Sequence, residues 1–331
     1  MACTTTTLAG FPEELLERIL AFVVVAPPTA HPRAPWHPSP NAASSETPIR
    51  TRTAALLVSR AFHRIALPLF YHTLVLHTPS QSRGLLAALG ARPALTRCVR
   101  TLVLSDPSPA DADLLVLVGS TLRALDVTLP PVLPAIDALA LEHALARPLP
   151  ALRALAIRKA AGTYLSQPAP RAVLCALADT VAAAPLLEET TTSFPLSADP
   201  ALAPLVDALA AAPVLHTLRT PLPALWAPPL LGVSANPALK QICLAAGEDA
   251  PCPVRANSYS ASYSASAKDG GAGKAYADLW RARPIVGTGL FLAAARKHAH
   301  LSELIRAGTP IIGWRGRAWT VGADAREVQT C

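Results

Sequence analysis

A six-residue pattern recurs through the chain and limits its fold more than any other feature. The pattern has the form L-x-x-L-x-L with variations, and its copies begin at residues 71, 99, 122, 152, 187, 215 and 239. Consecutive starts lie 23 to 35 residues apart. Because apolar residues at alternate positions bury one side of an extended segment, each copy predicts a short β-strand.

Alanine- and leucine-rich stretches separate the copies, and a proline stands two residues before several of them. These prolines are Pro150, Pro185, Pro213 and Pro237. The stretches predict helices that end near the proline. A unit of one strand and one helix cannot bury its apolar face alone and must stack on its neighbours. The sequence therefore predicts an α/β fold, with an irregular leucine-rich-repeat solenoid over 71–331 in which helices line the outside of a curved parallel sheet.

The array is less regular than most leucine-rich repeats. One spacing of 35 residues exceeds the usual range, and the copy LEETTT at residue 187 has lost its central leucine. A doubly wound α/β fold shares the alternation of strands and helices. That fold carries a glycine-rich phosphate-binding turn after an early strand, which this sequence lacks, so the irregular solenoid is the preferred interpretation.

The N-terminal region contains two apolar stretches separated by a segment unsuited to a core. Residues 11–25 read FPEELLERILAFVVV and residues 53–71 read TAALLVSRAFHRIALPLFY, which predicts amphipathic helices over 11–25 and 53–66. The segment 26–50 is rich in proline, serine and alanine and is predicted to be a disordered insertion. The apolar side of the first helix is wider than one helix–helix contact requires, so part of it is expected to meet another surface.

Joined across the insertion, the two stretches resemble an F-box: an apolar-Pro-Glu start, Leu-Leu-x-x-Ile, and then a Val-Ser-x-x-Phe helix. Phe11 stands where the family usually has leucine, and the insertion lengthens a connection that is normally short. The runs IALPLFYHTLVLHTPSQ and LSELIRAGTP extend the resemblance to the F-box proteins with degenerate leucine-rich repeats that are abundant in fungi. The resemblance implies a three-helix F-box-like domain over 1–70, followed by the solenoid.

The resemblance also implies a function. The protein would be a substrate receptor of a cullin-based ubiquitin ligase, would not itself be an enzyme, and would bring a protein target to ubiquitin-dependent degradation. Its N-terminal helices would bind the S-phase-kinase-associated adaptor, which connects to the cullin scaffold. The implied adaptor contacts are Pro12, Leu15, Leu16, Ile19, Val58 and Phe62. The alternative is a leucine-rich-repeat interaction scaffold that acts outside a ubiquitin ligase.

The protein target is expected to bind the strand positions that alternate with the buried leucines. In a solenoid these positions face the concave side, which is the usual binding face. They are Thr101, Val103, Asp126, Thr128, Arg158, Glu189, Thr191, Thr217, Arg219 and Gln241. The predicted target contacts among them are Asp126, Arg158, Glu189, Arg219 and Gln241.

Composition argues against several other kinds of partner. The net charge is +7 over 331 residues and no lysine or arginine cluster stands out, so neither nucleic acid nor a membrane is expected as a partner. The six cysteines show no C-x-x-C spacing, and His298 and His300 lack a third ligand, so no metal or cofactor is expected. Glu13, Glu14 and Glu17 interrupt the first apolar run, which argues against a signal peptide and for an intracellular protein, cytoplasmic or nuclear.

The C-terminal third holds segments of unusual composition. Residues 251–275 are rich in Ser, Ala and Gly and are predicted to form a flexible insertion. Its AKDGGAGKA run lacks the serine or threonine of a phosphate loop after Lys274, and no G-x-S-x-G or H-E-x-x-H motif occurs, so no catalytic residue is assigned. Trp280, Trp314 and Trp319 are interpreted as a cap over the end of the solenoid, with an aromatic ligand anchor as the alternative.

Overall fold

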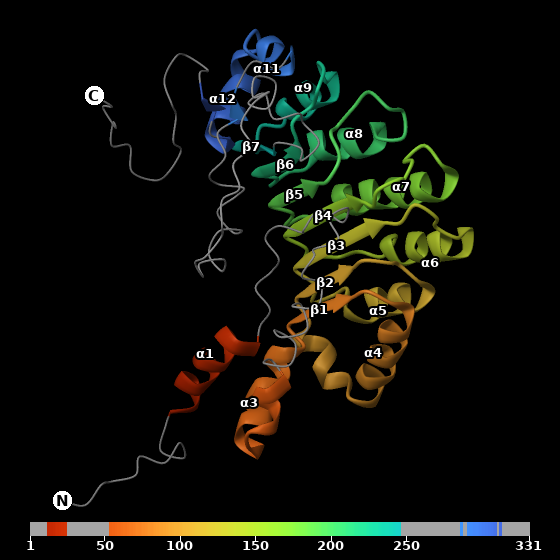
Figure 1. The fold of residues 1–331 in the computed structure, drawn as a ribbon, viewed down its shortest axis with the longest axis vertical. Helices are drawn as coiled ribbons and strands as arrows, with labels where there is room; N and C mark the ends of the chain where they lie inside the picture. The colour runs from red at the N-terminus through yellow and green to blue at the C-terminus, as the bar shows by residue number, and fades with distance from the viewer. Residues whose placement is uncertain (1–11, 25–52, 246–284, 287–289, 310, 313–331) are drawn as a thin grey trace, which may run out of the picture. The chain divides into compact units, whose positions relative to one another are not determined.

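The computed structural model describes residues 12–24, 53–245, 285–286, 290–309 and 311–312. Within these ranges the chain is an α/β protein in which short parallel strands alternate with helices (Figure 1). The two predicted insertions and the three tryptophans of the predicted cap lie outside the described residues. In the ranges that are described, no helix is long and apolar enough to cross a membrane.

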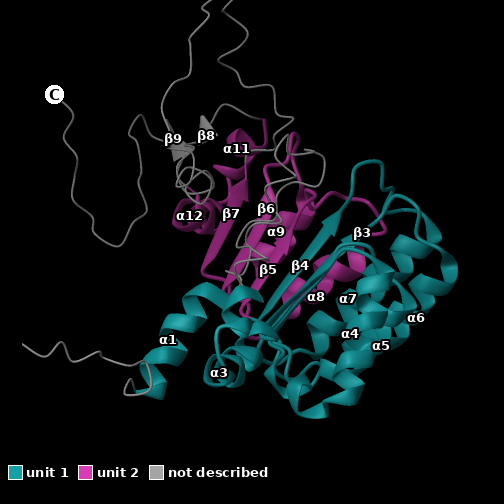
Figure 2. Ribbon diagram, turned by 60° about the horizontal axis from the view of Figure 1, so that its bottom comes forward, with its two compact units in different colours: residues 1–187 teal, residues 188–331 magenta. Residues whose placement is uncertain are grey.

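The chain divides into two compact units, Met1–Leu187 and Glu188–Cys331, which are coloured separately in Figure 2. The division falls inside the repeat array, so the N-terminal helices belong to the same unit as the first strands. The predicted boundary at residue 70 is not the place where the two compact units part.

The first unit begins with helices and continues as alternating strands and helices. In chain order its elements are α1 (Glu13–Val24), a short helix over 53–57, α3 (Arg60–Phe70), β1 (Thr73–Leu76), α4 (Pro79–Ala91), the 3₁₀-helix η3 (Pro93–Cys98), β2 (Thr101–Leu104), α5 (Pro109–Val118), β3 (Ala124–Leu129), α6 (Ala135–Leu145), β4 (Ala154–Lys159) and α7 (Pro168–Ala183). The strands pair in parallel in the order β1-β2-β3-β4. Helices α4 to α7 pack side by side along one side of these strands (Figures 1 and 2).

The second unit continues the alternation and ends in a pair of helices. Its elements are β5 (Glu189–Thr192), α8 (Ala203–Ala211), β6 (Thr217–Pro221), α9 (Pro228–Ser234), β7 (Gln241–Ala245), β8 (Ile285–Val286), α11 (Leu290–Ala295), α12 (Ala299–Gly308) and β9 (Ile311–Ile312). The strands β5, β6 and β7 pair in parallel in that order, and β8 pairs in parallel with β9.

The strands predicted from the six-residue pattern are confirmed. Each of β1 to β7 begins two residues after the start of a copy. In β3 the alternate residues Leu125, Val127 and Leu129 are buried, as the pattern requires. The position of each strand in the parallel α/β fold could therefore be predicted from its own six-residue copy. The assignment of the fold to the leucine-rich repeats stays a prediction.

The irregular copy LEETTT also forms a strand, with threonines at the positions that leucines fill elsewhere. Thr190 and Thr192 of β5 are buried to 0% and 2% exposure. The Thr192 hydroxyl donates to the carbonyl of Phe194 at 2.9 Å. The Thr190 hydroxyl has no hydrogen-bond partner among the described residues, so its burial costs free energy that a hydrocarbon side chain would not.

We expect Thr190→Val to stabilise the protein by about 1 kcal/mol, because valine has the same shape without the unsatisfied hydroxyl. The matched variant Thr192→Val should destabilise it by a similar amount, because that hydroxyl has a partner. Urea unfolding of the full chain measures both changes. The explanation fails if the two variants shift stability in the same direction.

The N-terminal helices enclose a small core of their own. Leu16, Leu20 and Val24 from α1 pack with Ile65 and Ala66 from α3. The single helix predicted over 53–66 is wrong in detail, since it breaks at 58–59 and its second part continues to Phe70. The cause is local: the Ser59 side chain accepts a hydrogen bond from the backbone N–H of Phe62 and so begins a new helix.

Helix α12 lies against the last strand of the repeat pattern, β7. The Thr309 hydroxyl, just beyond α12, donates to the carbonyl of Ile242 at 2.9 Å and accepts from the N–H of Leu244 at 2.7 Å. A Cβ atom added to Gly308 would lie 2.5 Å from the Ile242 carbonyl oxygen. The glycine therefore allows the helix end to approach the β7 backbone, where an open strand edge would otherwise offer groups for pairing with another chain.

We expect Gly308→Ala to destabilise the second unit by about 1–3 kcal/mol, the usual cost of overpacking. Gly232 of α9 is a matched control, because nothing lies within 4 Å of a Cβ added there. Gly232→Ala should be neutral or stabilising by up to about 1 kcal/mol, because alanine is the better helix former. Calorimetric melting distinguishes the two, and equal melting temperatures would contradict the close approach of α12 to β7.

Candidate interaction surfaces

Helix α1 and the segment just before α3 have exposed apolar residues, in addition to the core that α1 and α3 share. These exposed residues, here called the helical surface, are Leu15 (43% exposed), Ile19 (52%), Phe22 (92%), Val23 (41%), Leu57 (84%) and Val58 (61%). The broad apolar arc of α1 thus divides in two: one part packs on α3, and the other faces solvent. Exposed apolar side chains beside a small helical core are candidates for a protein–protein contact.

An ion pair joins the two helices beside this surface. Arg64 of α3 donates to Glu13 of α1 at 2.7 Å, with the side chains 67% and 53% exposed. The hydrogen bond to Glu13 and its charge raise the pKa of Arg64 above its ordinary value. An exposed pair stabilises little, so the pairing of the helices depends mainly on their apolar core.

The expected adaptor contacts divide between exposed and buried residues of the N-terminal region. Pro12, Leu15, Ile19 and Val58 are exposed. Phe62 is half-buried against the core of the helices, and Leu16 is buried in it. Leu16 therefore packs inside the helical pair and does not belong to the helical surface.

Sequence reasoning did not assign a contact role to Phe22, Val23 or Leu57, although they are among the exposed apolar residues. Phe22 and Val23 lie on the same apolar arc as the predicted residues, which was the available signal. Leu57 ends the short helix just before the break at 58–59, and no periodic pattern marks it.

On the strand face of the first unit, two of the predicted target contacts neutralise each other. Arg158 of β4 donates from Nε to Asp126 Oδ1 at 2.5 Å and from Nη2 to Asp126 Oδ2 at 2.6 Å. The two side chains are 7% and 12% exposed. The expectation that these two side chains face solvent is wrong. Asp126 of β3 and Arg158 of β4 lie diagonally opposite, two residues out of register. Their two parallel hydrogen bonds satisfy both charged groups, which allows the pair to be buried.

Two further expected surface positions are also buried. Thr128 of β3 is 9% exposed and Thr217 of β6 is 8% exposed. Thr101, Val103 and Thr191 are half-buried. The strand face is therefore less accessible than a plain alternation of buried and exposed positions predicts.

The second unit repeats the diagonal ion pair in a more open form. Arg219 of β6 donates from Nε to Glu189 of β5 at 2.5 Å, and the side chains are 30% and 40% exposed. Burial lowers the pKa of Arg219, but the hydrogen bond and charge of Glu189 outweigh it and raise that pKa. Burial also raises the pKa of the Cys243 thiol, which lies opposite Arg219 on β7. Gln241, the remaining predicted contact, donates to the Thr217 hydroxyl at 3.0 Å.

Comparison with protein-family models, curated proteins and solved structures finds no match to this chain. The surfaces must therefore be judged on their own chemistry. Of the predicted target contacts, Glu189, Arg219 and Gln241 remain partly accessible, while Asp126 and Arg158 are buried.

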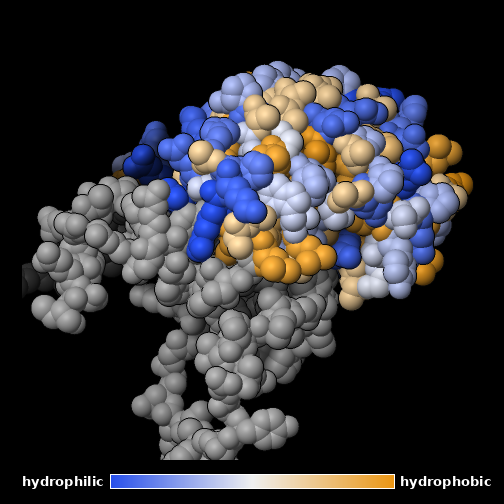
Figure 3. Space-filling view, turned by 90° about the horizontal axis from the view of Figure 1, so that it is seen from above, coloured by the Kyte–Doolittle hydropathy of each residue, from blue (hydrophilic) through white to orange (hydrophobic). Residues whose placement is uncertain are grey.

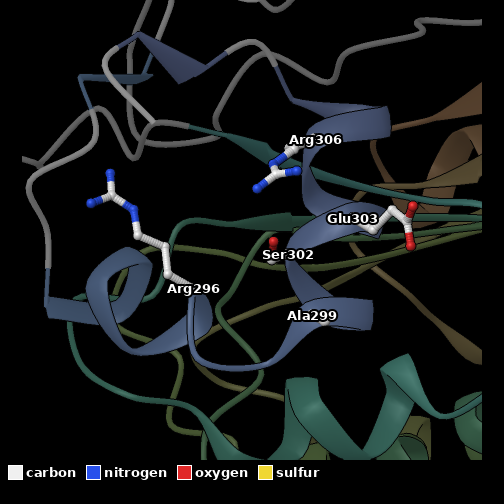
Figure 4. Close-up of a pocket in the computed structure, with 5 residues that line it drawn as sticks. All are labelled: Arg296, Ala299, Ser302, Glu303 and Arg306. Atoms are coloured by element: carbon white, nitrogen blue, oxygen red, sulfur yellow. The ribbon is translucent and has the colours of Figure 1, made fainter. Parts of the chain in front are cut away.

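A pocket of about 260 Å³ lies beside α12, lined by Arg296, Ala299, Ser302, Glu303 and Arg306. Figure 4 shows the Glu303 carboxylate turned away from the two guanidinium groups. Both arginines already interact with other groups of the chain, so the pocket is not an open anion-binding site.

Two other features of the described residues do not form a recognisable site. His298 stacks on Trp226 with ring centroids 5.1 Å apart, and Phe291 stacks on the same indole at 5.9 Å, so His298 takes part in packing. Among the residues that the structure describes, no group of three or more His, Cys, Asp or Glu could hold a metal ion. On the face seen in Figure 3, hydrophobic and hydrophilic residues are mixed in small groups.

Proposed function

We propose that this protein is an F-box-type substrate receptor of a cullin-based ubiquitin ligase. The observation that carries the proposal is the helical surface, which exposes apolar side chains at the positions where the sequence resembles an F-box. Leu15, Ile19 and Val58 belong to both the resemblance and the exposed set. Single exposed apolar residues also occur elsewhere on this chain, such as Ile136 and Leu225, so the support comes from the coincidence of the helical surface with the F-box-like positions.

Burial of the helical surface against an adaptor would contribute favourable free energy to the complex. Burying one large apolar side chain stabilises a complex by about 1.5–3 kcal/mol before the costs of association. Phe22 and Leu57, the most exposed of the six, would serve as anchors if they enter pockets on the adaptor. The polar neighbours Glu13 and Arg64 would form part of the rim.

The repeats would hold the target while the adaptor links the receptor to the cullin. Tethering raises the local concentration of the target's lysines near the charged ubiquitin-conjugating enzyme. In this mechanism the receptor contributes binding only. Glu189, Arg219 and Gln241 are the accessible members of the expected target face.

The decisive experiment is co-purification of the full chain with the S-phase-kinase-associated adaptor from a mixture of purified proteins. A one-to-one complex on gel filtration supports the proposal. A chain that elutes alone at micromolar concentrations contradicts it and favours the interaction scaffold that works outside a ligase.

A further inference from the structure

A row of basic side chains crosses the first unit at the beginning of its strands. The second residue of each repeat copy immediately precedes its strand, and in the first unit these residues, here called the basic row, are His72, Arg100, Arg123 and Arg153. Because the strands are parallel, the four residues lie at the same end of the sheet. Along the sequence they are 23 to 30 residues apart, so no cluster is visible there.

A repeated backbone contact fixes the basic row. The N–H groups of Arg100 and Thr101 both donate to the carbonyl of His72, each at 3.0 Å. The next step repeats it, with Arg123 and Ala124 donating to the Arg100 carbonyl at 2.7 and 2.9 Å. A third step follows from Arg153 to Arg123. Neighbouring members are therefore held about 4.8 Å apart, and the whole basic row spans about 14 Å.

The charges in the basic row act on one another. Burial lowers the pKa of His72, and the positive charges of Arg100 and Arg123 lower it further. Arg100 donates to the Thr121 carbonyl at 3.1 Å, which holds its side chain in place. Arg153 is exposed and already interacts with another group of the chain. Arg123 is exposed, and within the described residues its guanidinium makes no hydrogen bond or ion pair, so it is the member most available to a ligand. Like charges on neighbouring strands destabilise a sheet, so this arrangement favours an anionic partner.

Two acidic side chains of the first unit lie at the opposite end of the strands. Asp106 follows β2, and Asp137 lies in the first turn of α6, after β3. Burial, and then the charge of Asp106, raise the pKa of Asp137, so these carboxylates lie near each other. Lys159 ends β4 at this same end, so charges of both signs lie there, and the argument for a negative partner depends on the basic row itself.

We propose that the basic row binds an extended, acidic segment of a partner protein. Guanidinium groups bind carboxylates through paired hydrogen bonds, and an extended peptide presents side chains on one side about every 7 Å, so three carboxylates span the row. Single-stranded nucleic acid would need flat rings for base stacking. Tyr71, next to His72, packs edge-on against Phe70 at 76° and forms no such platform. That the partner is the receptor's target rests on the proposed function, whereas acidic-peptide binding itself does not.

The test uses a fluorescent nine-residue peptide of alternating glutamate and serine, with fluorescence anisotropy measured on the full chain. We expect binding that weakens as salt is raised. Arg123→Glu should reduce the affinity about tenfold or more, because it replaces a charged hydrogen-bond donor with a repelling carboxylate. Arg171→Glu on α7 makes the same change of charge at an exposed position outside the basic row and should leave the affinity unchanged.

A second measurement follows the ring of His72 by NMR. A bound acidic peptide should raise the pKa of His72, because it offsets the positive charges of Arg100 and Arg123 that lower it. If Arg123→Glu lowers the melting temperature, Arg123→Gln serves as the test variant in its place. Arg123→Gln should keep the wild-type melting temperature and should still weaken peptide binding.

Three results would overturn the inference: no binding of the acidic peptide by the wild-type chain, equal binding by wild type and the Arg123 variants, or tighter binding of a uridine oligonucleotide than of the peptide. Adaptor co-purification is measured in the same samples and should not change. Failure of the basic row is thereby distinguished from failure of the proposed function.

Discussion

The double variant Ile19→Asp, Val58→Asp should lose adaptor binding by about 100-fold or more. Both side chains are exposed members of the helical surface, at 52% and 61%, so the free protein tolerates aspartate there. In the complex each carboxylate would be buried against apolar groups without a partner, which costs several kcal/mol. Isothermal calorimetry with purified adaptor measures the change.

Ile136→Asp on α6 is the matched control for this experiment. Ile136 is 72% exposed and lies in the same compact unit, outside the helical surface. The control should bind the adaptor like wild type, and circular dichroism should show the same helix content for all three proteins. An unchanged affinity of the double variant would exclude the helical surface as the adaptor site.

Arg158→Ala should destabilise the first unit by about 3–5 kcal/mol. The substitution leaves the Asp126 carboxylate, whose side chain is 12% exposed, without its two hydrogen bonds. Removing one partner of a buried pair costs far more than the pair contributes, because the remaining charge stays desolvated. Amide hydrogen exchange in β3 and β4 measures the loss locally, where a global melt would average both units.

Two comparisons identify the cause. Asp126→Leu combined with Arg158→Met removes both charges and should recover most of the stability. Arg219→Ala breaks the corresponding pair of the second unit, where Glu189 stays 40% exposed to water, and should cost less than about 1 kcal/mol. A double variant as unstable as Arg158→Ala would show that the unpaired carboxylate does not account for the loss.

The strands could be predicted from the sequence because their cause is local. Each six-residue copy carries its own apolar residues at alternate positions, so β3 and β4 could be predicted without knowledge of the rest of the chain. The break at Ser59 could also have been predicted, because serine is a preferred N-cap residue whose side chain accepts a hydrogen bond from the backbone N–H three residues later, here that of Phe62. The pattern of apolar periodicity concealed it, because the apolar face continues through the break.

The interaction surfaces could be predicted only in part, because they depend on residues far apart in the sequence. Asp126 and Arg158 lie 32 residues apart, and only the strand register brings them together. His72 and Arg100 are separated by a full repeat. Leu16 and Ile19 lie on the same apolar arc of α1, and only the position of α3 decides that one is buried and the other exposed.

The contact between α12 and β7 also limits how the number of repeats in this protein can change during evolution. Repeat proteins commonly grow by duplication of a unit, and a new unit can join wherever a strand edge is open. Gly308 packs against the backbone of β7, and Thr309 hydrogen-bonds to it, so a strand added beside this edge of β7 would have to displace them. We therefore expect added units before β7, and we expect the glycine and threonine at the end of α12 to persist in descendants that differ in the number of repeats.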